Sequence, residues 1–213
     1  MKLYHFNDPL DFQFARAARK GTWVTNPRGC NECGRLIEQR RISPLIIEWF
    51  PDSDTIGDFT WPGFNDEIVV SQNVREHLEG NFRSFEFLAI QMYQNPKLKR
   101  PQKITKRNKP RVWLPYDGPP LWELKPTSWC KLDHNKSGLM LESVCNTCGR
   151  PKYIHPPFED RYLVLDRKTW AGEDIFYLQE YTGWVFCTEE VKLFIERKGF
   201  TNAGFSLDGE IPE

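Results

Sequence analysis

The residues best suited to chemistry in this sequence are two copies of one short cysteine motif. Cys30-Asn-Glu-Cys33-Gly34 and Cys145-Asn-Thr-Cys148-Gly149 share the pattern C-N-x-C-G. Such a turn can place two thiolates on one cation, with backbone N–H groups directed at sulfur. A single CxxC also occurs in thioredoxin-like redox pairs, whereas two copies favour a four-sulfur site. We therefore predict one structural zinc ion bound by Cys30, Cys33, Cys145 and Cys148.

The other cysteines and histidines are weaker candidates for ligands. Cys130 and Cys187 lie outside the motifs, and we expect both to be small buried hydrophobic residues. His134 and His155 lie near the second motif but lack the paired spacing of a zinc finger, so they are only reserve ligands.

The start of the chain indicates the compartment. It lacks a basic segment followed by an apolar one, and no run of about 18 apolar residues occurs anywhere. We therefore expect a cytoplasmic protein without a membrane partner. In that reducing compartment, paired cysteines hold metal more often than they form disulfides.

Composition indicates a folded protein with room for one or two domains. The chain has 213 residues, 39% of them hydrophobic, and 29 basic residues balance 29 acidic ones. It is therefore neither a disordered acidic tail nor a basic nucleic-acid arm. Its length allows one large domain or two small ones, and disulfides are not needed for stability.

The cysteine motifs belong to a longer internal repeat. Cys30 and Cys145 are 115 residues apart, Ser71 and Thr188 are 117 apart, and Phe87 and Phe205 are 118 apart. Each half has a CxxCG turn, a strand-like run, a hydroxyl residue that can cap a helix, and a Phe-ending tail. We expect an α+β fold of two tandem pseudo-repeats that share one zinc site, with the first repeat at 1–96 and the second at 112–213.

Both helices carry capping and stop signals. Ser71 and Thr188 precede apolar positions at helical spacing, and Gly80 and Gly199 follow them. We predict that these hydroxyl residues are N-caps, that Gly80 or Asn81 ends the first helix and that Gly199 ends the second.

The sequence offers no recognisable catalytic site. It lacks a glycine-rich phosphate loop, a G-x-S-x-G turn and an HExxH helix. Asp58 and Asp174 could form a carboxylate pair, but their equivalent places in the two repeats favour turn or cap roles. We predict no catalytic residues, no enzymatic activity and no small-molecule substrate.

Residues 97–111 contain eight positive residues and no acid. The prolines and the neutral whole-chain balance favour a solvated linker between the repeats, while a nucleic-acid-binding patch stays the alternative. The following segment is rich in proline and tryptophan, and we expect its aromatic residues mostly to pack against the protein.

Taken together, the paired turns, their wide separation and the capped helix after each resemble a family of bacterial proteins named for a double CxxCG motif. Some of its members are described as immunity proteins that protect a cell from a neighbour's toxin. The resemblance covers most of the chain but not the basic stretch 97–111. It implies a non-enzymatic protein whose partner is a cognate toxin.

Two functions stay open at this point. The first is an immunity protein that uses a zinc-stapled scaffold to occlude its toxin. The second is a zinc-ribbon-like nucleic-acid-binding or regulatory module that uses residues 97–111 against phosphates. The toxin's identity, its contact residues and the oligomeric state do not follow from the sequence.

Overall fold

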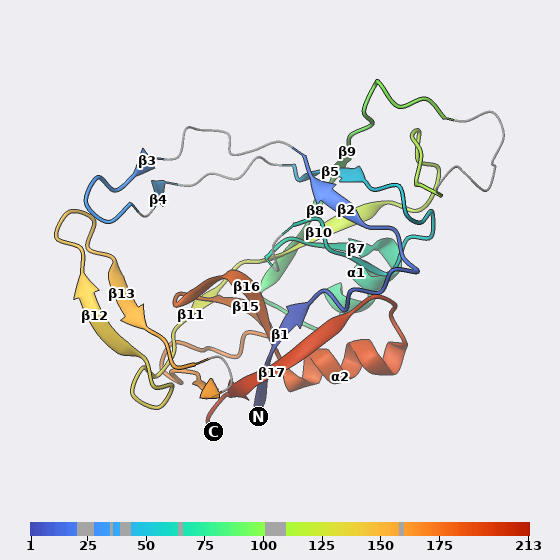
Figure 1. Cartoon of the computed structure of the whole chain (residues 1–213). Coiled ribbons are helices and arrows are strands. Elements are labelled where there is room, and N and C mark those ends of the chain that lie inside the picture. Colours follow the sequence, from blue (N-terminus) through green and yellow to red (C-terminus); the bar gives the residue numbers. More distant parts are fainter. Residues whose placement is uncertain (21–27, 35, 39–43, 64–65, 101–109, 158–159) are drawn as a thin grey trace.

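The chain combines helices with strands, as predicted, but sheet dominates. The computed structural model describes residues 1–213 except 21–27, 35, 39–43, 64–65, 101–109 and 158–159 (Figure 1). The described residues form two helices and five sheets. None of the helices in this part of the chain is long and apolar enough to cross a membrane.

Two larger sheets make up the body of the protein. The six-stranded sheet has the order β11 (Trp129–Cys130), β15 (Ile175–Leu178), β16 (Tyr181–Thr188), β1 (Lys2–Asn7), β17 (Gly204–Glu210) and β14 (Leu163–Val164). The four-stranded sheet has the order β6 (Phe59–Thr60), β7 (Ile68–Ser71), β10 (Leu121–Pro126) and β8 (Phe85–Ala89).

Three smaller sheets surround this body. One contains β2 (Ala17–Arg19), β5 (Ile46–Trp49) and β9 (Gln91–Met92). The others are two-stranded: β3 (Arg28–Gly29) pairs with β4 (Leu36–Glu38), and β12 (Met140–Val144) pairs with β13 (Pro151–Ile154). These two strand pairs form arms that extend from the body and meet at their tips (Figure 1).

Both predicted helices and their caps are confirmed. In α1 (Gln72–Glu79) the Ser71 hydroxyl accepts from the Val74 N–H, and in α2 (Glu189–Lys198) the Thr188 hydroxyl accepts from the Val191 N–H. Gly80 and Gly199 are the C-caps. Only Gly199 adopts the left-handed conformation, with φ of 69°, which glycine accommodates without steric cost.

Each large sheet includes a strand from the other predicted half of the chain. β1 lies between β16 and β17, and β10 lies between β7 and β8. The registers correspond, because Leu3 pairs with Thr188 just as Leu121 pairs with Ser71. The sequence pattern did not predict this exchange, and the domain boundaries at 96 and 112 stay predictions.

Aromatic contacts between the halves are reciprocal. The His77 ring packs edge-on against Phe200 at a centroid distance of 5.6 Å, and Phe82 packs edge-on against Phe194 at 5.1 Å. His77 and Phe194 occupy corresponding helix positions, while Phe82 and Phe200 begin corresponding tails. The segment that follows each helix therefore packs against the other helix.

Asp58 and Asp174 form hydrogen bonds between the two halves of the chain, which the predicted turn or cap roles did not include. The Asp58 carboxylate accepts from the Ser71 hydroxyl at 2.8 Å and from the Thr201 N–H at 3.0 Å. The Asp174 carboxylate accepts from the Arg83 N–H at 2.9 Å. Each aspartate therefore holds the tail that follows the other half's helix.

Three buried clusters stabilise these layers. The first lies between the two large sheets and the helices and includes Phe6, Phe59 and Cys187. The second includes Leu3, Phe186 and Cys130, and the third includes Ile47 and Val69. Cys130 and Cys187 are fully buried, so the prediction of their burial is confirmed.

Candidate metal centre

The two CxxCG turns lie at the tips of the two arms. In each turn the glycine N–H donates to the carbonyl oxygen of the first cysteine, from Gly34 to Cys30 and from Gly149 to Cys145, both at 2.8 Å. Both glycines have φ of 69°, a conformation that disfavours any residue with a Cβ atom. The repeated pattern in the sequence therefore encodes the same turn twice.

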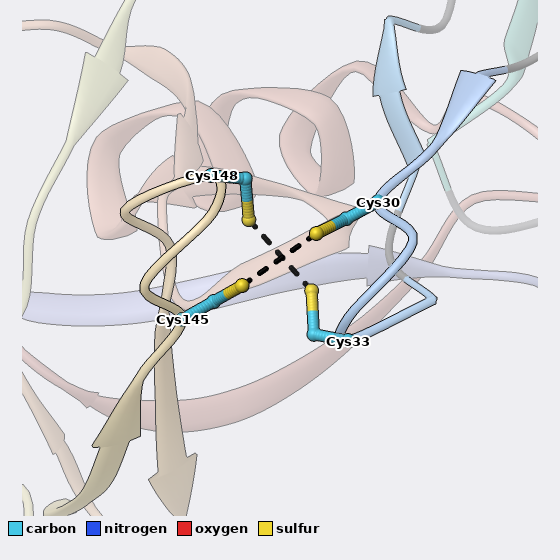
Figure 2. A group of neighbouring side chains, drawn as sticks. All are labelled: Cys30, Cys33, Cys145 and Cys148. Atoms are coloured by element: carbon cyan, nitrogen blue, oxygen red, sulfur yellow. Dashed lines mark hydrogen bonds between the residues drawn. The ribbon is translucent and has the colours of Figure 1, made fainter.

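The four motif cysteines converge on one point. Figure 2 shows their side chains directed inward, with Cys30 and Cys33 from one arm and Cys145 and Cys148 from the other. The Sγ atoms of Cys30 and Cys145 are 3.5 Å apart, those of Cys33 and Cys148 are 3.7 Å apart, and all four sulfurs lie within 4.8 Å of one another.

These separations suit tetrahedral coordination. Metal–sulfur bonds of about 2.3 Å place the corners of a tetrahedron roughly 3.8 Å apart. The two crossed sulfur pairs come within a few tenths of an ångström of that edge. The four cysteines could therefore hold one metal ion, and in the described part of the chain they form the one cluster of this kind.

Backbone N–H groups favour a thiolate at Cys30. The N–H groups of Cys33 and Glu32 lower the pKa of the Cys30 thiol from 9.0 to about 7. These N–H groups therefore favour the thiolate form of Cys30 before any cation binds. Thiolate is the form of cysteine that binds metal.

The pKa of the Cys145 thiol is shifted in the opposite direction. The Cys148 N–H, its largest single influence, favours the thiolate, but burial and the neighbouring Cys30 and Cys148 sulfurs raise the pKa of Cys145 to about 12. Four sulfurs this close cannot all carry a negative charge unless a cation compensates them. Metal binding at this centre must therefore displace protons.

A residue that the sequence analysis missed joins the two turns. Glu32 Oε2 accepts from the Thr147 hydroxyl at 2.7 Å and from the Thr147 N–H at 3.1 Å, and it lies 3.5 Å from Cys145 Sγ. The Thr147 hydroxyl is the main cause of the lowered pKa of Glu32. The sequence did contain a signal for this contact, because the motifs C-N-E-C-G and C-N-T-C-G differ only at the position of Glu32 and Thr147.

The remaining sulfur and imidazole groups lie elsewhere. Burial raises the pKa of Cys130 to about 12 and that of Cys187 well above its ordinary value, so both stay protonated. His134 Nε2 lies 2.6 Å from Glu180, and His155 Nδ1 lies 3.0 Å from the Tyr181 hydroxyl. Neither reserve histidine belongs to the cysteine cluster.

Most of the predicted basic linker lies outside the described residues. Lys97, Lys99 and Arg100 are described and exposed, whereas 101–109 are not described. Both interpretations of this stretch stay predictions.

Comparisons with known proteins do not identify the chain: no protein-family model matches it, and no curated protein does either.

Proposed function

We propose that this chain is a zinc-stapled immunity protein that binds and neutralises a cognate bacterial toxin without turning over a substrate. The observation that carries the proposal is the convergence of two distant CxxCG turns into one four-sulfur cluster. Tetrahedral sulfur coordination suits zinc. Four thiolates would fill the coordination of zinc and leave no position for a reactive water, so its role would be structural.

The position of the cluster indicates what the metal would stabilise. Cys30 is buried and Cys33 is exposed, and the three hydrophobic clusters of the body include none of the four motif cysteines. A metal at the tips would therefore fix one arm to the other, while the large sheets keep their own cores. Loss of the metal should free the arms and leave the body folded.

We further propose that the body arose by duplication with an exchange of strands. The matching positions of β1 and β10, the reciprocal aromatic pairs and the equivalent roles of Asp58 and Asp174 support this interpretation. The exchange makes the halves mutually dependent, since each large sheet needs a strand from the other half. A rigid scaffold of this kind suits a protein that must present a fixed surface to its partner.

Co-expression with the protein encoded by the adjacent reading frame tests the proposed function. Cells that produce this neighbour should survive only when they also produce the chain, and the two purified proteins should form a stoichiometric complex. Survival without a complex, or catalytic turnover of the neighbour or its product, would overturn the proposal.

A nucleic-acid-binding module is the second candidate, favoured by the eight positive residues in 97–111. That function requires affinity for DNA or RNA that falls steeply with salt. Neutralising Lys97, Lys99 and Arg100 should then weaken nucleic-acid binding, whereas the immunity function should survive this change.

A further inference from the structure

An exposed apolar surface lies beside the three-stranded sheet in the described part of the chain. We define the Phe12 face as Leu10, Phe12, Arg16 and Phe50. Leu10, Phe12 and Phe50 expose 61%, 65% and 43% of their surface. The Arg16 guanidinium carbon lies over both rings, 5.0 Å from the centroid of Phe12 and 5.9 Å from that of Phe50.

Strand alternation explains why these side chains face outward. Ala17, Ile47 and Trp49 are buried in the third hydrophobic cluster, so Arg16 and Phe50, next to them in sequence, take the opposite side of the sheet. The Phe50 N–H donates to the Arg16 carbonyl at 2.8 Å and fixes the two residues side by side.

The loops that carry the face are held in place. The Ser53 hydroxyl donates to the Gln13 carbonyl at 2.7 Å, and the Ala15 N–H donates to the Thr55 carbonyl at 2.7 Å. Asp52 accepts from Arg16 at 2.6 Å and fixes the guanidinium. Binding through an ordered surface costs little conformational entropy. Rigid aromatic side chains around an arginine are also the composition typical of interface hot spots.

The charge around the face is negative. Asp8, Asp11 and Asp54 lie on the same two loops, and none of them forms an ion pair within the described residues. The charge of Arg16 is balanced by Asp52, so among the described residues these three carboxylates have no ion-pair partner on the loops that carry the face. A complementary partner surface must therefore be basic at its rim and apolar at its centre.

We propose that the Phe12 face is the docking site for the toxin and that it covers a basic surface, such as the one with which a nucleic-acid-cleaving toxin holds phosphates. This inference rests on the proposed function and adds to it the location and chemistry of the interface. The face lies at the start of β2 and the end of β5, and these strands are remote from β3, β4 and the β12–β13 pair that carry the cysteines (Figure 1).

The chain offers a matched control surface. The hairpin β12–β13 also exposes apolar side chains, including Met140, Leu141 and Ile154, but its Glu142 and Lys152 neutralise each other at 2.7 Å. The hairpin therefore presents apolar area without the negative rim. Variants there report the effect of removing exposed hydrophobic surface in general.

The test measures binding of the purified protein encoded by the adjacent reading frame to four forms of the full chain. These are the wild type, Phe12→Ala with Phe50→Ala, Asp8→Asn with Asp11→Asn and Asp54→Asn, and the control Met140→Ala with Ile154→Ala. We expect the aromatic variant to bind at least about 30-fold more weakly, the value that corresponds to loss of a hot spot. The aspartate variant should associate more slowly and lose most of the salt dependence of its association rate.

The outcomes separate this inference from the proposed function. If the wild type does not bind the neighbour at all, the proposed function fails and the docking site fails with it. If all four forms bind equally, or only the β12–β13 control weakens binding, the function stands and the docking site is wrong. If the chain dimerises in sedimentation and the aromatic variant is monomeric, the face joins two copies of this chain and the toxin assignment is overturned.

Discussion

Replacing Asp58 with alanine should loosen the contact between the two halves. The carboxylate accepts three hydrogen bonds: from the Ser71 hydroxyl at 2.8 Å, from the Thr201 N–H at 3.0 Å and from the Thr201 hydroxyl at 2.9 Å. A hydrogen bond to a charged group contributes about 1.5–3 kcal/mol when desolvated. Because Asp58 is half-exposed, water compensates part of the loss, and we take about 1 kcal/mol for each bond.

The expected loss in the free energy of unfolding is therefore about 3 kcal/mol, which for a chain of this size lowers Tm by roughly 6–12 °C. Asp58→Asn keeps one carbonyl acceptor but loses the charge, so its effect should be about half as large. Urea denaturation followed by circular dichroism measures both.

Asp54→Ala is the matched control, because Asp54 is an exposed aspartate in the preceding loop with no ion pair in the described part of the chain. Its effect should stay within about 0.5 kcal/mol of the wild type. If Asp58→Ala lowers the free energy of unfolding no more than this control, the hydrogen bonds of Asp58 do not stabilise the contact between the two halves.

Three further changes test the capping and the metal centre. Thr188→Ala should lower the free energy of unfolding by about 1 kcal/mol through loss of the N-cap of α2, while the exposed Thr182→Ala should leave it nearly unchanged. Glu32→Ala should weaken metal affinity by about 10-fold or more in competition with a chelator, because Glu32 holds Thr147 across the site. Glu32→Gln retains an acceptor and should weaken the affinity less. Equal metal affinities of both variants and the wild type would refute this role of the Glu32–Thr147 hydrogen bond. Acidification from neutral pH should release the metal, because protons compete with it for the four sulfurs. Without metal the pKa of Cys30 is about 7 and that of Cys145 is raised, so both sulfurs hold protons below neutral pH. Metal content that stays constant down to pH 4 would contradict thiolate coordination.

The parts of the molecule that could be predicted from sequence are those encoded by neighbouring residues. The CxxCG turns and the caps at Ser71 and Thr188 need only a few consecutive residues, and the structure contains both. The convergence of the cysteines followed from the requirement that a metal be surrounded by four ligands.

Features that depend on distant pairings could not be predicted in the same way. β1 and β10 have strand-like sequences, but nothing in their composition indicates which half they pair with, so the exchange was missed. The bond between Glu32 and Thr147 spans 115 residues and depends on how the arms approach each other. The Phe12 face likewise exists only because residues near 12 and near 50 meet at the β2–β5 pair.

Metal analysis of the purified full chain tests the central claim most directly. Elemental analysis combined with native mass spectrometry should find one zinc ion per chain, and Cys145→Ser should lose it while the circular dichroism signal of the sheets persists. A protein without metal that instead contains Cys30–Cys33 and Cys145–Cys148 disulfides under reducing conditions would contradict the four-sulfur zinc centre.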